Sequence, residues 1–81
     1  MLPITHLDGS DVVVIDSLGQ QVPAVDEVRV EPGLAVVAVN TGARDWLHAL
    51  LAHGADEPLE CAIRSRRGEL HHCGAVRVVF V

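Results

Sequence analysis

The chain has 81 residues, a formal net charge of −5 at pH 7 and a hydrophobic residue content of 49%. This length corresponds to one domain, so residues 1–81 are expected to fold as a single compact unit. Binding to nucleic acid requires several Lys or Arg side chains against phosphates, so the acidic balance argues against a nucleic-acid partner. The longest apolar run, residues 34–39, is far shorter than the ~20 residues of a membrane-spanning helix, and no signal peptide is recognised. We therefore expect no membrane association and a cytoplasmic location, or a virion if a phage encodes the chain.

The composition also bears on origin and on the core. All basic residues are Arg and Asn40 is the only Asn, which is typical of a high-GC genome or of a phage that infects such a host. Trp46 and Phe80 are the only aromatic residues, so Val, Leu, Ile and Ala must build most of the core. A chain this short leaves a large share of its surface in water. Its high apolar content therefore suggests that another protein chain covers part of that surface.

Three strands are expected in the first half of the chain. Residues 11–17, with the sequence D-V-V-V-I-D-S, are rich in β-branched side chains and apolar on both faces, as in a central or doubly covered strand. Residues 25–31 alternate between apolar and charged side chains and form a second strand. The Pro-Gly pair at residues 32–33 predicts a turn into a third strand at residues 34–40, and residues 4–6 could add a short strand at the beginning.

The apolar period changes to that of a helix at residues 41–53. Ala43, Trp46, Leu47, Leu50 and Leu51 fall on one helical face, and we expect Trp46, Leu47 and Leu50 to be largely buried. Asn40 or Thr41 can cap the beginning of the helix, and His53 followed by Gly54 is a typical end.

Two more strands, residues 59–65 and 70–81, follow around a turn that contains Gly68. The predicted element order is β-β-β-α-β-β. This order predicts the α+β class, with a small, mainly antiparallel sheet of four to five strands and one helix packed on one face.

The register of the final hairpin determines whether its Cys and His side chains could bind a metal. If residue i pairs with residue 135−i, one apolar face collects Leu59, Cys61, Ile63, Leu70, His72, Val76, Val78 and Phe80. Cys73 and His71 then lie on the opposite face, with His71 exposed beside Arg64. Because this register separates the two thiols, we predict that both are reduced and metal-free, and that the chain binds no cofactor. No Ser, Cys or carboxylate has the neighbours that catalysis needs, so an enzymatic function is not predicted.

The remaining surface features favour binding to other protein chains. Three arginines form the only basic cluster, at the tip of the final hairpin, and the last strand, V-R-V-V-F-V, is apolar on both faces. We predict a non-enzymatic protein–protein interaction or assembly module, such as a small phage or virion structural or accessory protein, that forms a homo-oligomer or joins a larger assembly. Two alternatives are a small regulator that blocks a host protein through the arginine tip, and a small metal- or ligand-binding protein that uses the His/Cys hairpin. The predicted partner-binding residues are Arg64, Arg66, Arg67, His71, Val79 and Val81.

Overall fold

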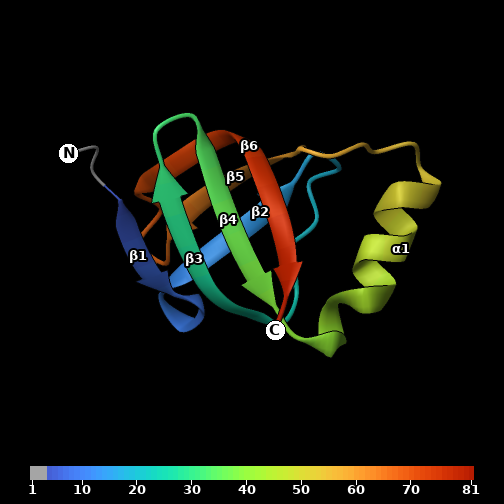
Figure 1. Ribbon diagram of the computed structural model, residues 1–81. Helices are drawn as coiled ribbons and strands as arrows, with labels where there is room; N and C mark the ends of the chain where they lie inside the picture. Colours follow the sequence, from blue (N-terminus) through green and yellow to red (C-terminus); the bar gives the residue numbers. More distant parts are fainter. Residues whose placement is uncertain (1–3) are drawn as a thin grey trace.

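The computed structural model describes residues 4–81, which form one sheet and one α-helix (Figure 1). The helix, α1 (Arg44–Ala52), lies between the fourth and fifth strands in the sequence. The predicted α+β class is therefore confirmed. The strands are β1 (Thr5–Asp8), β2 (Val12–Asp16), β3 (Val25–Glu31), β4 (Leu34–Val39), β5 (Leu59–Ser65) and β6 (Leu70–Phe80).

The sheet contains six strands in the order β1-β3-β4-β6-β5-β2. All neighbouring strands are antiparallel except β4 and β6, which are parallel. The predicted sheet of four to five mainly antiparallel strands was thus too small and missed the parallel pair. The C-terminal strand β6 lies between β4 and β5, so it is not an edge strand of the sheet.

The first two strands curl the sheet. They are consecutive in the sequence, yet they occupy its two opposite edges and are joined only by a 3₁₀ turn, Gly9–Asp11. Gly9 allows this bend, because a Cβ atom there would overlap the backbone carbonyl of Val25. The segment that precedes β3 in the chain also reaches β2, because the Val22 amide donates to the Val14 carbonyl of β2 at 2.8 Å. Counted as one bent strand, β1 and β2 therefore nearly close the sheet into a partly open, five-stranded barrel.

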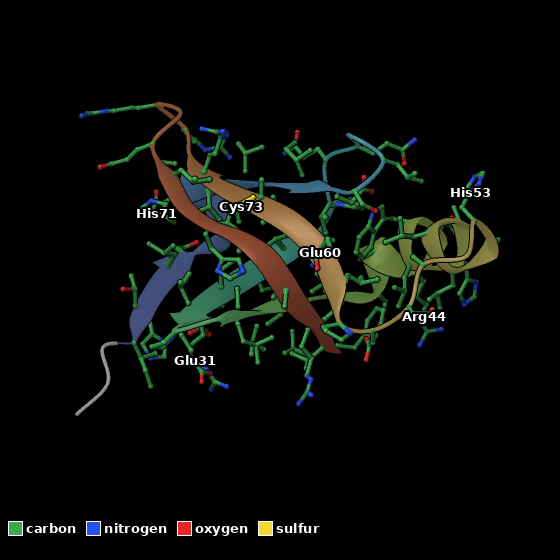
Figure 2. All side chains as sticks on the ribbon, turned by 90° about the horizontal axis from the view of Figure 1, so that it is seen from above. Glu31, Arg44, His53, Glu60, His71 and Cys73 are labelled. Atoms are coloured by element: carbon green, nitrogen blue, oxygen red, sulfur yellow. The ribbon has the colours of Figure 1, made fainter. Side chains whose placement is uncertain are left out.

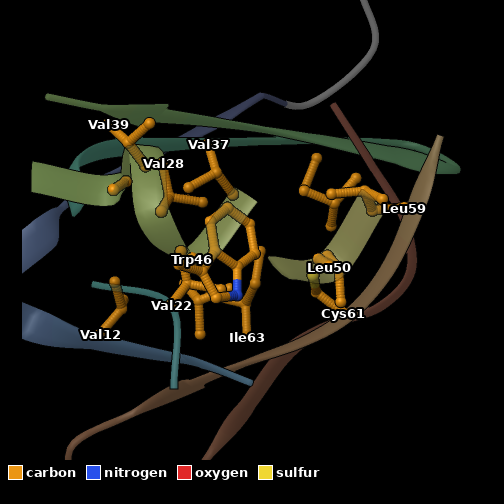
Figure 3. Close-up of a cluster of buried hydrophobic side chains, with 14 residues drawn as sticks. Val12, Val22, Val28, Val37, Val39, Trp46, Leu50, Leu59, Cys61 and Ile63 are labelled. Carbon is orange, nitrogen blue, oxygen red and sulfur yellow. The ribbon is translucent and has the colours of Figure 1, made fainter. Parts of the chain in front are cut away.

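The core fills the concave interior of this curled sheet (Figure 3). Valine side chains from β2, β3 and β4 meet Leu59, Cys61 and Ile63 of β5 across the interior, and Trp46 of α1 inserts among them. The buried hydrophobic residues are Val12, Val14, Val22, Val28, Ala35, Val37, Val39, Ala43, Trp46, Leu50, Leu59, Cys61, Ile63 and Val76.

The helix lies beside one end of the curled sheet (Figure 1). It follows a 3₁₀ turn, Thr41–Ala43, in which the Gly42 amide donates to the Asn40 side-chain oxygen at 2.9 Å. Asn40 therefore caps this turn at the predicted start of the helical segment, whereas α1 itself begins after Ala43 without a side-chain cap. Trp46 and Leu50 are buried and Leu47 is half-buried, which confirms most of the predicted face. Leu51 is 46% exposed, because a helix at the end of a barrel buries a narrower stripe than one lying along a sheet. Within residues 4–81, no helix is long and apolar enough to cross a membrane.

A buried carboxylate fixes the helix to the sheet. Asp16, at the end of β2, is only 5% exposed, and its Oδ2 accepts a hydrogen bond from the Trp46 indole Nε1 at 2.8 Å. Its Oδ1 accepts from the backbone amides of Leu18 at 2.8 Å and Gln20 at 2.9 Å, which holds the turn that leaves β2. Asp16 was not among the residues predicted to be important, although an Asp that precedes a Leu-Gly turn is a recognisable turn signal.

Candidate functional site

Two of the three arginines predicted to bind a partner hold the tip of the β5–β6 hairpin in place. The Arg64 guanidinium donates to the Gly68 carbonyl at 3.0 Å, and the Arg66 Nε donates to the Ser10 carbonyl. The Arg66 contact ties the hairpin tip to the bend between β1 and β2. Arg67 is exposed, and only its backbone amide is bonded, to the Ser65 hydroxyl. These contacts give the tip a structural role of its own.

His71 lies at an irregularity in the hairpin. The predicted register is confirmed from the Leu59–Val76 pair to the Ile63–His72 pair, and then shifts by one residue so that Arg64 pairs with Leu70. The shift turns Leu70 to the outer face, where it is half exposed, so its predicted place in the interior was wrong. His71 is half-buried and not exposed as predicted, because it occupies the bulge.

The two cysteines occupy opposite faces, as the register predicted. Cys61 is buried and pairs with Gly74, whereas Cys73 is exposed and pairs with Ala62. Burial, with a smaller effect of the Asp16 and Glu60 carboxylates, raises the pKa of the Cys61 thiol to about 11. Within residues 4–81, no three His, Cys, Asp or Glu side chains converge as metal ligands, so the alternative of a metal-binding hairpin has no geometric support.

His72, the other histidine of this strand, faces the rim of the interior. It is half-buried, and its Nε2 lies 2.9 Å from the Ala75 carbonyl oxygen. Its partner across the hairpin is Ile63, on the face opposite that of Cys73. A catalytic pair of His72 and Cys73 is therefore not formed, although the two residues are adjacent in the sequence.

Val79 and Val81 point away from the core, as predicted. Val79 is 37% exposed and lies on the outer face, in a shallow hollow that it shares with Val36 and Ala38. Polar side chains border this hollow, including His6 and Glu27, whose Nδ1 and Oε1 atoms are 3.2 Å apart. Val81 is 71% exposed, although its backbone amide donates to the Val39 carbonyl at 2.9 Å.

A groove that the sequence analysis missed lies between α1 and the C-terminal end of β6. It has a volume of about 310 Å³ and is lined by Arg44, Leu47, His48 and Phe80. Phe80 is on the inward face of β6, opposite Val39, as predicted. It is nevertheless 45% exposed, because the sheet ends there and only the first half of α1 lies beside it. The sequence contained no local signal for this site, because Leu47 and Phe80 were both expected in the core and are brought together only by the tertiary fold.

The groove combines an apolar surface with a basic rim. Leu47 is half-buried and packs against the core, and together with Phe80 it forms the apolar part. Arg44 and His48 are one helical turn apart on α1, so both side chains project on the same side, and both are exposed. Among residues 4–81, neither side chain takes part in an ion pair within 4.0 Å. The charge of Arg44 is therefore available to a partner.

The predicted partner-binding residues do not form one surface. The arginine tip and His71 lie near the beginning of β6, whereas Val79 and Val81 lie at its other end, roughly 30 Å away at about 3.3 Å per strand residue. Figure 2 shows His71 and Arg44 on opposite sides of the molecule. The groove and Val81 share one end of the molecule, and the arginine tip is at the other.

Comparisons with protein families, with curated proteins and with solved structures found no match for this chain. Its function must therefore be inferred from the geometry just described.

Proposed function

We propose that the chain is a non-enzymatic protein-interaction module, and that its main binding surface is the groove between α1 and β6. The observation that carries this proposal is the partial exposure of Phe80, one of the chain's two aromatic side chains, next to Leu47 and beneath a basic rim. Exposed aromatic side chains in a hollow with a polar border are the usual anchors of protein interfaces.

The outer face of the barrel favours a protein partner over a nucleic acid. Partly open five-stranded barrels include oligonucleotide- and oligosaccharide-binding domains, which use the face of their second and third strands. The corresponding strands here are β3 and β4, whose outer face carries Glu27, Arg29, Val36 and Ala38. This surface has no aromatic side chain on which a base could stack, and its charge does not attract phosphate. The analogy in architecture therefore supports no nucleic-acid function for this chain.

Two buried groups that catalysis could use, the Asp16 carboxylate and the Cys61 thiol, have structural surroundings, which supports a non-enzymatic function. The Asp16 carboxylate accepts three hydrogen bonds from neighbouring donors, which hold the turn after β2 and the Trp46 side chain in place. The raised pKa of Cys61 keeps this thiol protonated near neutral pH, whereas a nucleophilic cysteine needs a lowered one.

Site-specific photo-crosslinking in the native cell tests this proposal. A benzophenone analogue of phenylalanine would replace Phe80, and in parallel experiments Arg67 at the hairpin tip and the exposed Thr41. We expect a protein adduct of one discrete mass from position 80 and none from position 41. An adduct from position 67 alone would favour the regulator that acts through the arginine tip, and the absence of any protein adduct would reject the interaction function. The same experiment on purified protein identifies a second copy of the chain as the partner.

A further inference from the structure

The C-terminal part of β6 has a neighbouring strand on one side only. On one flank, β4 pairs with β6 from Val76 to Phe80. On the other flank, β5 begins at Leu59, which pairs with Val76, so β5 provides no partner for residues 77–80. Within residues 4–81, no other strand takes this place. The groove beside α1 lies along this unpaired flank, since Phe80 belongs to both.

The hydrogen bond of Val81 shows which backbone groups of this flank are open. The N–H and C=O groups of one strand residue point to the same side, and those of the next residue point to the other. The Val81 amide donates to the Val39 carbonyl of β4, so residues 77, 79 and 81 direct their polar groups toward β4. The N–H and C=O groups of Val78 and Phe80 must then point toward the groove.

We propose that the groove binds an extended segment of a partner protein, which adds to β6 as a further strand alongside Val78 and Phe80. The open backbone groups favour an extended chain, because only a strand presents donors and acceptors at matching intervals. One side chain of the segment would pack against Leu47 and Phe80, and a carboxylate on the segment would face Arg44. This inference rests on the proposed protein-interaction function and specifies the partner's conformation and charge.

The charge of the rim selects an acidic segment. The chain as a whole carries a net charge of −5, which by itself would repel acidic partners. At the groove, Arg44 places a positive charge beside the apolar surface, and the adjacent acid, Asp45, lies about 100° from Arg44 around the helix at 3.6 residues per turn. A positive rim next to an apolar surface fits a segment in which apolar and acidic side chains alternate.

Synthetic peptides provide the test, with binding followed by NMR of the isotope-labelled full chain. The probe is a nine-residue peptide of alternating Val and Glu. One control peptide has Lys in place of Glu, and another carries N-methyl groups on alternate amides, which remove the hydrogen bonds of an added strand. We expect the Val/Glu peptide to shift the amide signals of Val78, Phe80, Arg44 and His48, and to bind at least tenfold more tightly than either control. Equal binding of all three peptides, or shifts confined to the other open strand, β1, would overturn the inference.

Two matched variants of the chain sharpen this test. Arg44→Glu should reverse the preference from the Glu to the Lys peptide, whereas Arg77→Glu, on the outer face of the same strand β6, should leave the preference unchanged. Equal effects of the two variants would show that general charge, and not the groove, governs binding. If crosslinking at position 80 gives a protein adduct but no peptide binds, the interaction function stands and the strand-addition mode is rejected. If neither occurs, both are rejected.

Discussion

Replacing Asp16 by Asn tests the bond that fixes α1 to the barrel. The amide can keep one carbonyl oxygen on the amides of Leu18 and Gln20, but its NH₂ group then faces the Trp46 indole N–H, which is 2.8 Å from Oδ2 in the native protein. Two donors cannot bond to each other, so the buried indole N–H loses its acceptor. Leaving one buried donor unsatisfied costs about 1–3 kcal/mol, and losing the charge weakens the two remaining bonds. We expect the free energy of unfolding to fall by about 2–4 kcal/mol.

A double-mutant cycle with Trp46→Phe isolates this bond. The phenylalanine side chain has no N–H group, so the conflict between two donors is absent when Asp16→Asn is combined with Trp46→Phe. The double variant should therefore be more stable than the sum of the single effects predicts, by about 1–3 kcal/mol. Urea unfolding followed by far-UV circular dichroism measures all four proteins, since Trp46 is the only tryptophan and fluorescence is lost with it. Asp56→Asn, in an exposed loop, is the control and should change stability by less than about 0.5 kcal/mol. Strict additivity of the two mutations, or a cost of Asp16→Asn as small as that of the control, would refute the proposed role of Asp16.

Four further predictions follow from the packing. In the folded protein, one thiol, that of Cys73, should react rapidly with an alkylating reagent near pH 8 while Cys61 reacts only on unfolding; rapid labelling of both would contradict the burial of Cys61. The pKa of Cys61 is about 11 in the folded protein and its ordinary value is 9.0. The unfolded thiol therefore ionises first, so the contribution of Cys61 to the free energy of unfolding is constant below pH 9 and is lost between pH 9 and 11. Urea unfolding of a Cys61→Ala variant should not show this loss of stability between pH 9 and 11. Gly9→Ala should destabilise the fold by about 2 kcal/mol or more, since the added methyl group meets the backbone of β3. Arg66→Ala should lower the free energy of unfolding by only about 0.5–1 kcal/mol, the net contribution of one exposed hydrogen bond. Thermal unfolding that ranks these two variants in the opposite order would contradict the assigned contacts. If the outer face also contacts a second copy of the chain, Val79→Asp should reduce the mass found by light scattering at micromolar concentration, and a wild-type monomer would exclude that contact between copies.

The elements that depend on neighbouring residues could be predicted from the sequence. The helix cap at Asn40, the buried positions of Trp46 and Leu50, and the opposite faces of Cys61 and Cys73 all follow from periodicity and from a short hairpin. Each of these features is determined by side chains within about ten residues, so local patterns contain the necessary information.

The features that depend on distant contacts could not be predicted. Apolar alternation is the same whether β6 lies at an edge or between two strands, so the parallel pairing with β4 left no local signal. The bend at Gly9 curls the sheet, and glycine is required there because the backbone of Val25, which is distant in the sequence, packs against it. The groove was missed for the same reason, because Leu47 and Phe80 come together only once the helix lies at the end of the curled sheet.

The bent first strand has a consequence for how the chain folds. The pairs of β2 with β5 join residues as far apart in the sequence as Val12 and Ser65, whereas β3 with β4 and β5 with β6 are local hairpins. Closing a long loop costs more entropy than closing a short one, and distant pairings slow the folding of small domains. The two hairpins can thus form early, while β2 joins β5 only after nearly the whole chain has collapsed around Trp46. The barrel therefore closes as one cooperative step, and neither half of the chain has a complete interior without the other.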